Sequence, residues 1–157
     1  MSDYVVFTDG GCLGNPGVGA WAFVIYENNS LLFENSGSSG LTTNNIMELT
    51  AVINALTYIQ SGKQNYAEDN IVLFTDSDYV KRGISEWIPS WEKNGWRKSD
   101  GKPVKNRELW VKLDSLSESM KISWCHVSAH SGVEGNEKCD AMVKKAMQEH
   151  NEPGTLF

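Results

Sequence analysis

The residues 71–75, Ile-Val-Leu-Phe-Thr, form a continuous run of β-formers that limits most strictly how this chain can fold. A strand without alternating polar residues needs cover on both faces, which is typical of a central strand in an α/β protein. The 157 residues can supply that cover, because one domain of this length buries roughly two thirds of its unfolded surface. A composition of 40% hydrophobic and 22% charged residues also fits a globular protein. We therefore expect an α/β fold around this strand.

The segments before and after this run predict one mixed sheet. Three strands are expected at 4–11, 20–27 and 31–35, and turn residues at 14–17 and 28–29 join them into an antiparallel meander. A last strand is expected at 121–127. The expected helices are 44–59, 77–87, 108–117 and 137–150, and the expected loops are 61–70, 91–106 and 131–136. A meander followed by alternating helices and strands places helices on the faces of the sheet.

The three cysteines, Cys12, Cys125 and Cys139, are odd in number and widely spaced. They predict neither a zinc site nor a disulfide framework, and they indicate a reducing compartment. The first apolar stretch ends at Asp9, too early for a signal peptide, and no run reaches the roughly 18 apolar residues of a membrane span. We expect a cytoplasmic protein without a membrane partner.

Four acidic residues stand in apolar sequence: Asp9 lies near the end of the first expected strand, Asp76 directly follows the apolar run 71–75, Glu48 lies in the first helix, and Asp140 lies early in the last helix. Taken singly, each has an ordinary explanation as a helix cap, a strand end or a solvent-facing side chain. Asp9 and Asp76 are informative as a pair, because sites in α/β proteins usually form at strand ends. Carboxylates without a Cys/His cluster favour a hard divalent cation. Two such cations about 3.5–4 Å apart can hydrolyse a phosphodiester.

Two other motifs carry less weight. Residues 76–78, Asp-Ser-Asp, look like the start of a calcium-binding EF-hand loop, but the sixth and twelfth positions hold Lys81 and Trp87 instead of Gly and Glu. We therefore reject an EF-hand. His130 lies in a loop before the last helix, where a surface position is the ordinary explanation. Beside a two-metal centre it could transfer protons, because histidine titrates near neutral pH.

The net charge of −6 argues at first against a nucleic-acid partner. However, residues 92–107 contain six basic and two acidic residues, so this segment carries +4 and the remainder of the chain −10. Trp87, Trp91 and Trp96 border or interrupt the segment, and basic side chains beside aromatic rings suit a phosphate backbone and sugar faces. A solvated basic loop is the alternative interpretation.

Together these motifs resemble type 1 ribonuclease H, the bacterial form in particular, over nearly the whole chain. The matching segments include Phe-Thr-Asp-Gly at 7–10, Cys-Leu-Gly-Asn-Pro-Gly at 12–17, Thr-Thr-Asn-Asn at 42–45, Met-Glu-Leu at 47–49, Thr-Asp-Ser at 75–77, Lys-Pro-Val-Lys-Asn at 102–106 and Cys-Asp at 139–140. The resemblance implies a ribonuclease H-like fold, with a five-stranded mixed sheet of three antiparallel strands and then parallel strands, flanked by helices. It implies an endonuclease that hydrolyses the RNA strand of RNA–DNA hybrids with two Mg²⁺ ions, for which Mn²⁺ can substitute, leaving 5′-phosphate and 3′-hydroxyl ends.

The resemblance also assigns roles to particular residues. The catalytic carboxylates and metal ligands are Asp9, Glu48, Asp76 and Asp140, and His130 assists proton transfer or product release. The 2′-hydroxyl groups that distinguish RNA from DNA are read by Cys12, Asn15, Asn44, Asn45 and Glu48. The DNA strand is contacted by Thr43 and Asn106 at a phosphate, by Trp87 at a sugar, and by a basic protrusion at about 91–106 that includes Trp96. Glu137 matches an auxiliary acid near the metals.

The chain departs from the bacterial pattern at two positions near the expected hybrid surface. Leu41 stands where an arginine is common, and Asp78 replaces a neutral glutamine. Because phosphate binding is driven by positive charge, we expect weaker hybrid binding at high salt than a more basic relative shows.

We expect a monomer with a catalytic domain at 1–150 and a tail at 151–157. The alternative from another class is a non-catalytic RNA–DNA hybrid-binding module of the same fold, which the complete set of acids disfavours. A junction resolvase or exonuclease of the same superfamily is disfavoured by the 2′-hydroxyl surface. A domain excised from a retroviral polyprotein is disfavoured by the absence of linker sequence.

Overall fold

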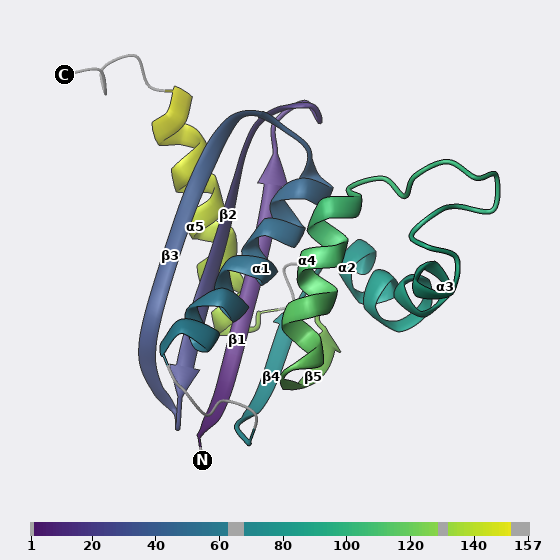
Figure 1. Ribbon diagram of the computed structural model, residues 1–157. Helices are drawn as coiled ribbons and strands as arrows, with labels where there is room; N and C mark the ends of the chain where they lie inside the picture. The colour runs from purple at the N-terminus through teal and green to yellow at the C-terminus, as the bar shows by residue number, and fades with distance from the viewer. Residues whose placement is uncertain (1, 63–67, 129–131, 152–157) are drawn as a thin grey trace.

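Figure 1 shows the computed structural model, which describes residues 2–62, 68–128 and 132–151. Within these ranges one sheet is formed by β1 (Asp3–Cys12), β2 (Gly17–Glu27), β3 (Ser30–Thr42), β4 (Asn70–Thr75) and β5 (Lys121–His126). The strand order is β3-β2-β1-β4-β5. The β1–β2 and β2–β3 pairs are antiparallel, whereas β4 is parallel to both β1 and β5. The predicted five-stranded mixed sheet is confirmed.

Helices cover both faces of this sheet. In the view of Figure 1, α1 (Asn44–Gly62) and α4 (Arg107–Glu118) lie in front of it and α5 (Glu134–Asn151) lies behind. The chain between β4 and α4 forms α2 (Asp78–Arg82), the π-helical turn η1 (Gly83–Trp87) and α3 (Ile88–Lys93). Residues 94–106 then project away from the body of the molecule (Figure 1). Among the described residues, no helix has the length and apolar character needed to cross a lipid bilayer.

Each face of the sheet has its own apolar core. The front core joins α1 and α4 to the sheet through fully buried side chains such as Leu56, Leu73 and Trp110. The rear core is smaller and packs Cys139 and Val143 of α5 against the alanines and Val24 of β2. Since apolar burial is the main favourable term in folding, these cores hold α1 and α5 on opposite faces of the same strands.

Several boundaries differ from the sequence prediction: β2 begins at Gly17 instead of Ala20, and α1 extends beyond Ile59 to Gly62. β3 continues to Thr42 instead of ending at Asn35, because its Ser- and Gly-rich half pairs with β2 despite a low strand propensity. The helix after Asp76 does not end at Trp87; helical backbone runs from Asp78 to Lys93, through residues expected to be irregular. The last helix begins at Glu134, three residues before the expected start.

Candidate active site

The first two acids are brought together by strand pairing. β1 and β4 are parallel neighbours, and Thr8 lies opposite Thr75, so the following residues, Asp9 and Asp76, lie side by side. The two carboxyl groups lie close enough for the charge of Asp76 to raise the pKa of Asp9. Asp9 is 7% exposed, and its Oδ1 accepts a 2.9 Å hydrogen bond from the Gly10 backbone N–H. The adjacency expected from two strand ends is therefore present.

The third acid, Glu48, reaches this pair from the front face. A Cβ atom on Gly10 would collide with the backbone of Met47 and Glu48, so β1 lies directly against α1 at this point. Ser77 orients the Glu48 side chain, because its Oγ donates a hydrogen bond to Glu48 Oε2. The same Oγ accepts from the Val80 N–H at 3.0 Å and thereby caps α2. Ser77 thus ties Glu48 to the end of β4.

The fourth acid, Asp140, comes from the rear face. Its neighbour Cys139 is buried, and the Cys139 thiol donates a hydrogen bond of 3.3 Å to the Phe7 carbonyl of β1. Burial and nearby acids raise the pKa of Cys139, so the thiol stays a neutral donor. Asp140 Oδ2 lies 2.9 Å from Lys144 Nζ, one helical turn further along α5. This packing places the Asp140 charge close enough to act on both Asp9 and Asp76.

The electrostatics of these acids are unfavourable in the absence of a cation. Burial, and then the charges of Asp76 and Asp140, raise the pKa of Asp9 from 3.8 to about 8. Burial, followed by the Asp76 charge, raises the pKa of Glu48 to about 7, although the Ser77 hydrogen bond opposes the shift. Burial also raises the pKa of Asp76. Clustered oxygen ligands with surplus negative charge suit a hard divalent cation such as Mg²⁺ or Mn²⁺, so the residues present fit a metal site.

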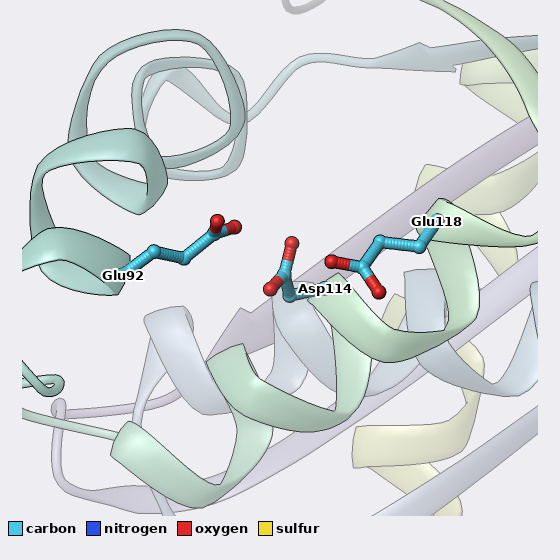
Figure 2. A group of neighbouring side chains, drawn as sticks. All are labelled: Glu92, Asp114 and Glu118. Carbon is cyan, nitrogen blue, oxygen red and sulfur yellow. The ribbon is translucent and has the colours of Figure 1, made fainter.

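A second acidic group lies elsewhere, between α3 and α4. Figure 2 shows that Glu92, Asp114 and Glu118 point toward one another, and their ligand oxygens all lie within 4.8 Å. Burial, followed by the hydrogen bond and charge of Glu92, raises the pKa of Asp114 to about 6. The group contains none of the four acids predicted from the sequence, and Glu92 and Glu118 are solvent-exposed. Exposed acidic groups of this kind are common without a bound ion.

Residues predicted to read the RNA strand lie together beside Glu48. Asn15 Oδ1 accepts a 2.8 Å hydrogen bond from the Asn44 backbone N–H, which joins the loop after β1 to the start of α1. Cys12 Sγ contacts the carbonyl of Thr42 at 3.3 Å. Thr43, which was predicted to bind a DNA phosphate, directly precedes Asn44. Its Oγ1 accepts from the Ile46 N–H at 3.2 Å, so Thr43 caps the start of α1. Asn45 follows in the first turn of α1 and is half-buried.

Of the residues predicted to contact the DNA strand, Trp87 ends η1, Trp96 lies in the protrusion after α3, and Asn106 directly precedes α4. Asn106 precedes α4 in a left-handed conformation with φ 59°, and its Nδ2 donates a 3.2 Å hydrogen bond to the Tyr79 hydroxyl. The Trp110 indole N–H donates to the same hydroxyl at 3.0 Å. Trp87 packs against Tyr79 with ring centroids 5.5 Å apart. Trp96 also has a positive φ of 61° and packs against the indole of Trp91, at the base of the protrusion.

Comparison with known proteins shows the family of the chain. The RNase H family model matches residues 1–148. The chain belongs to the ribonuclease H family. Ribonuclease H of Cyanothece sp. is 44% identical over 139 residues, covering 88% of this chain and 85% of the relative. Ribonuclease H of Neorickettsia sennetsu is 45% identical over 146 residues, covering 92% and 93%. The predicted family and the predicted enzyme class, a ribonuclease H, are confirmed.

Solved structures of ribonucleases H share the fold. The crystal structure of LC9-RNase H1, a type 1 RNase H with the type 2 active-site motif, superposes with a TM-score of 0.83 at 26% identity, covering 98% of this chain and 76% of that one. LC11-RNase H1, solved in complex with an RNA/DNA hybrid, gives a TM-score of 0.74 at 24% identity, covering 95% and 99%. At 24% identity, the similarity to LC11-RNase H1 shows only that the two proteins share a fold.

The ribonuclease H site also contains residues that sequence reasoning missed, whereas His130 lies outside the described residues. Ser77 could have been found from its position as a polar residue opening a helix after a strand. Lys144 could have been found from its i, i+4 spacing to Asp140. No local pattern indicates that Tyr79 receives hydrogen bonds from Asn106 and Trp110. Glu137 Oε1 accepts a 3.1 Å hydrogen bond from the Gly132 N–H, so it holds the segment that leads into α5.

Proposed function

We propose that this chain is an endonuclease that hydrolyses the RNA strand of RNA–DNA hybrids with two divalent cations, leaving 5′-phosphate and 3′-hydroxyl ends. Mg²⁺ is the expected cation and Mn²⁺ a substitute. The observation that carries the proposal is the convergence of Asp9, Glu48, Asp76 and Asp140 from four elements on one mutually repelling group of carboxylates. The curated relatives named Ribonuclease H and the LC11-RNase H1 structure with an RNA/DNA hybrid support the choice of substrate.

Each residue of the site has a definite task in this proposal. The four carboxylates hold the cations, which when bound activate a water molecule and stabilise the leaving oxygen. Ser77 keeps the Glu48 carboxylate directed toward Asp9 and Asp76 through its hydrogen bond. Burial keeps bulk water away from Asp9, which strengthens its interaction with any cation nearby. We assign His130 to proton transfer or product release, and Glu137 to the position of the segment beside it.

The hybrid is recognised through its shape and backbone. Cys12, Asn15, Asn44 and Asn45 contact 2′-hydroxyl groups near Glu48, because a 2′-hydroxyl is what distinguishes RNA from DNA. Thr43 and Asn106 bind a phosphate of the DNA strand at the starts of α1 and α4, which lie next to each other in Figure 1. Trp87, with Trp96 and the basic protrusion, holds the flanking sugar and phosphates. These contacts carry little base specificity. We further propose a monomeric, cytoplasmic protein.

Parallel digests of labelled duplexes test the function. RNA–DNA, RNA–RNA and DNA–DNA duplexes are incubated with Mg²⁺ or with EDTA, and product ends are identified by phosphatase and ligase treatment. We expect cleavage of the RNA strand of the hybrid, with Mg²⁺ only. Tight hybrid binding without cleavage would instead indicate a binding module, and cutting of the DNA duplex would indicate a resolvase or exonuclease.

A matched pair of variants tests which acidic group is catalytic. Asp76→Asn removes a carboxylate from the proposed site, and Asp114→Asn removes one from the separate group of Figure 2. Both residues are partly buried acids with raised pKa values, so the exchange has a similar effect on charge. We expect Asp76→Asn to abolish cleavage and Asp114→Asn to retain it. The reverse pattern would contradict the assignment of the site.

A further inference from the structure

We infer that Lys144 is an internal counter-ion of the carboxylate group and that its ammonium sets how tightly the site binds divalent cations. The inference rests on the proposed function, because it concerns the same four acids. Lys144 Nζ lies 2.9 Å from Asp140 Oδ2, within hydrogen-bonding distance. Lys144 and Asp140 are one turn apart on α5, so the helix itself presents the ammonium to the site.

The influence of Lys144 extends beyond this one contact. The negative charges of Asp9, on β1, and of Glu137, on α5, also act on its ammonium. Lys144 therefore interacts with two of the four acids, Asp140 and Asp9, and not only with its neighbour on α5. Lys145, the next residue, is different: its Nζ lies 3.9 Å from Glu149 Oε1, toward the end of α5. Both lysines are on α5 and carry the same charge, but Lys144 pairs with Asp140 of the proposed site and Lys145 lies near Glu149.

The ion pair is poorly suited to stabilising the fold. The side chain of Lys144 is 65% exposed, and exposed ion pairs contribute little to folding because water and salt screen them. The position of the Lys144 ammonium matters more for the binding of a divalent cation than for folding. A unit positive charge beside a divalent cation in water at physiological salt weakens cation binding by roughly three- to tenfold, because the two positive charges repel. The ammonium also engages the carboxylate of Asp140, which is one of the four proposed to hold the cations.

Lys144 consequently acts as a positioning residue with two opposing effects. Without metal it offsets part of the repulsion among the acids and holds Asp140 in place. With metal it competes for Asp140, which keeps the bound cations exchangeable. Removing the positive charge should therefore tighten cation binding, whereas removing a carboxylate should weaken it.

Titration calorimetry without substrate tests the inference on the full chain, with Mn²⁺ and Mg²⁺ as the probes. Lys144→Gln removes the charge, Lys144→Arg retains it, and Lys145→Gln is the matched control that removes the same charge one residue away. We expect Lys144→Gln to lower the dissociation constant roughly three- to tenfold, with the other two close to the parent chain. Circular dichroism confirms that each variant is folded.

Including Asp9→Asn in the same titrations separates the two proposals. If the parent chain binds cations, Asp9→Asn does not, and Lys144→Gln binds no more tightly than Lys145→Gln, then the Lys144 inference is wrong and the proposed site stands. If the parent chain and Asp9→Asn behave alike with either cation, the proposed metal site fails and the Lys144 inference fails with it.

Discussion

Replacing Asp9 by asparagine should stabilise the metal-free protein while abolishing hybrid cleavage. The exchange keeps the size of the side chain and an oxygen that can accept the Gly10 N–H, but it removes the buried charge. Asp9 has the strongest reason to prefer the neutral form, because burial and two neighbouring acids raise its pKa from 3.8 to about 8. Asp9→Asn therefore fixes the site in the uncharged state that the fold prefers without a cation.

The size of the effect follows from proton linkage. Between pH 3.8 and about pH 8 the folded chain keeps a proton on Asp9 that the unfolded chain has released, so the free energy of unfolding falls as pH rises. Each pH unit in this range lowers the free energy of unfolding by about 1.4 kcal/mol. A pKa shift of about four units therefore lowers the free energy of unfolding by about 5–6 kcal/mol above pH 8. Asp76 shares part of this loss, because the two carboxyls titrate together. We expect Asp9→Asn to gain about 3–5 kcal/mol at pH 9 and less than about 1 kcal/mol at pH 4.5.

Urea denaturation followed by circular dichroism measures this difference at pH 4.5, 7 and 9, with EDTA present throughout. Glu149→Gln, which removes an exposed carboxylate from α5, is the control and should change stability little at any of these pH values. An equal gain for Asp9→Asn at pH 4.5 and pH 9 would refute the electrostatic reasoning, as would a loss at pH 9. Added Mg²⁺ should stabilise the parent chain more than the variant, because a ligand stabilises the state that binds it.

Three further outcomes are expected. Ser77→Ala should cost about 1–2 kcal/mol in a thermal melt through loss of the helix cap, and should lower kcat because Glu48 loses its hydrogen bond. Tyr79→Phe should raise KM for the hybrid severalfold with little change in kcat, since the Asn106 amide loses its acceptor. Leu41→Arg, at a side chain that is 76% exposed, should tighten hybrid binding. The slope of the logarithm of the binding constant against the logarithm of the salt concentration, measured by fluorescence anisotropy, should become steeper by about one unit.

Local sequence patterns predicted the parts of the site that depend on strand ends. Asp9 and Asp76 each follow a run of β-formers, and parallel pairing of β1 with β4 brings them together. That β4 lies beside β1, and not at the far edge, depends on how the helices pack on the two faces, which no local pattern encodes. That all four acids come together in one site was expected only from the family resemblance.

The mistakes in element boundaries have physical reasons as well. The second half of β3 contains Ser36, Gly37 and Gly40, which are poor strand formers, and its extension depends on hydrogen bonds to β2. The helix was expected to end at about Trp87, and Pro89, two residues later, does not break it as a proline in a helix interior would. Pro89 instead occupies the first turn of α3, where a missing N–H costs nothing. Gly83 starts the intervening π-turn and packs directly on the Trp110 ring, so tertiary contact decides the path of the backbone.

The placement of the four acids explains why their repulsion can be tolerated. Two are fixed by strand pairing in the sheet, Glu48 is held by the front core through α1, and Asp140 is held by the rear core through α5. Relaxing the repulsion would require one of these elements to move, and that would open an apolar core whose burial contributes more than the separated charges would gain. Because the cores lie on opposite faces of the sheet, the site forms only when both are packed. The negative field that a cation would neutralise is therefore a property of the complete fold.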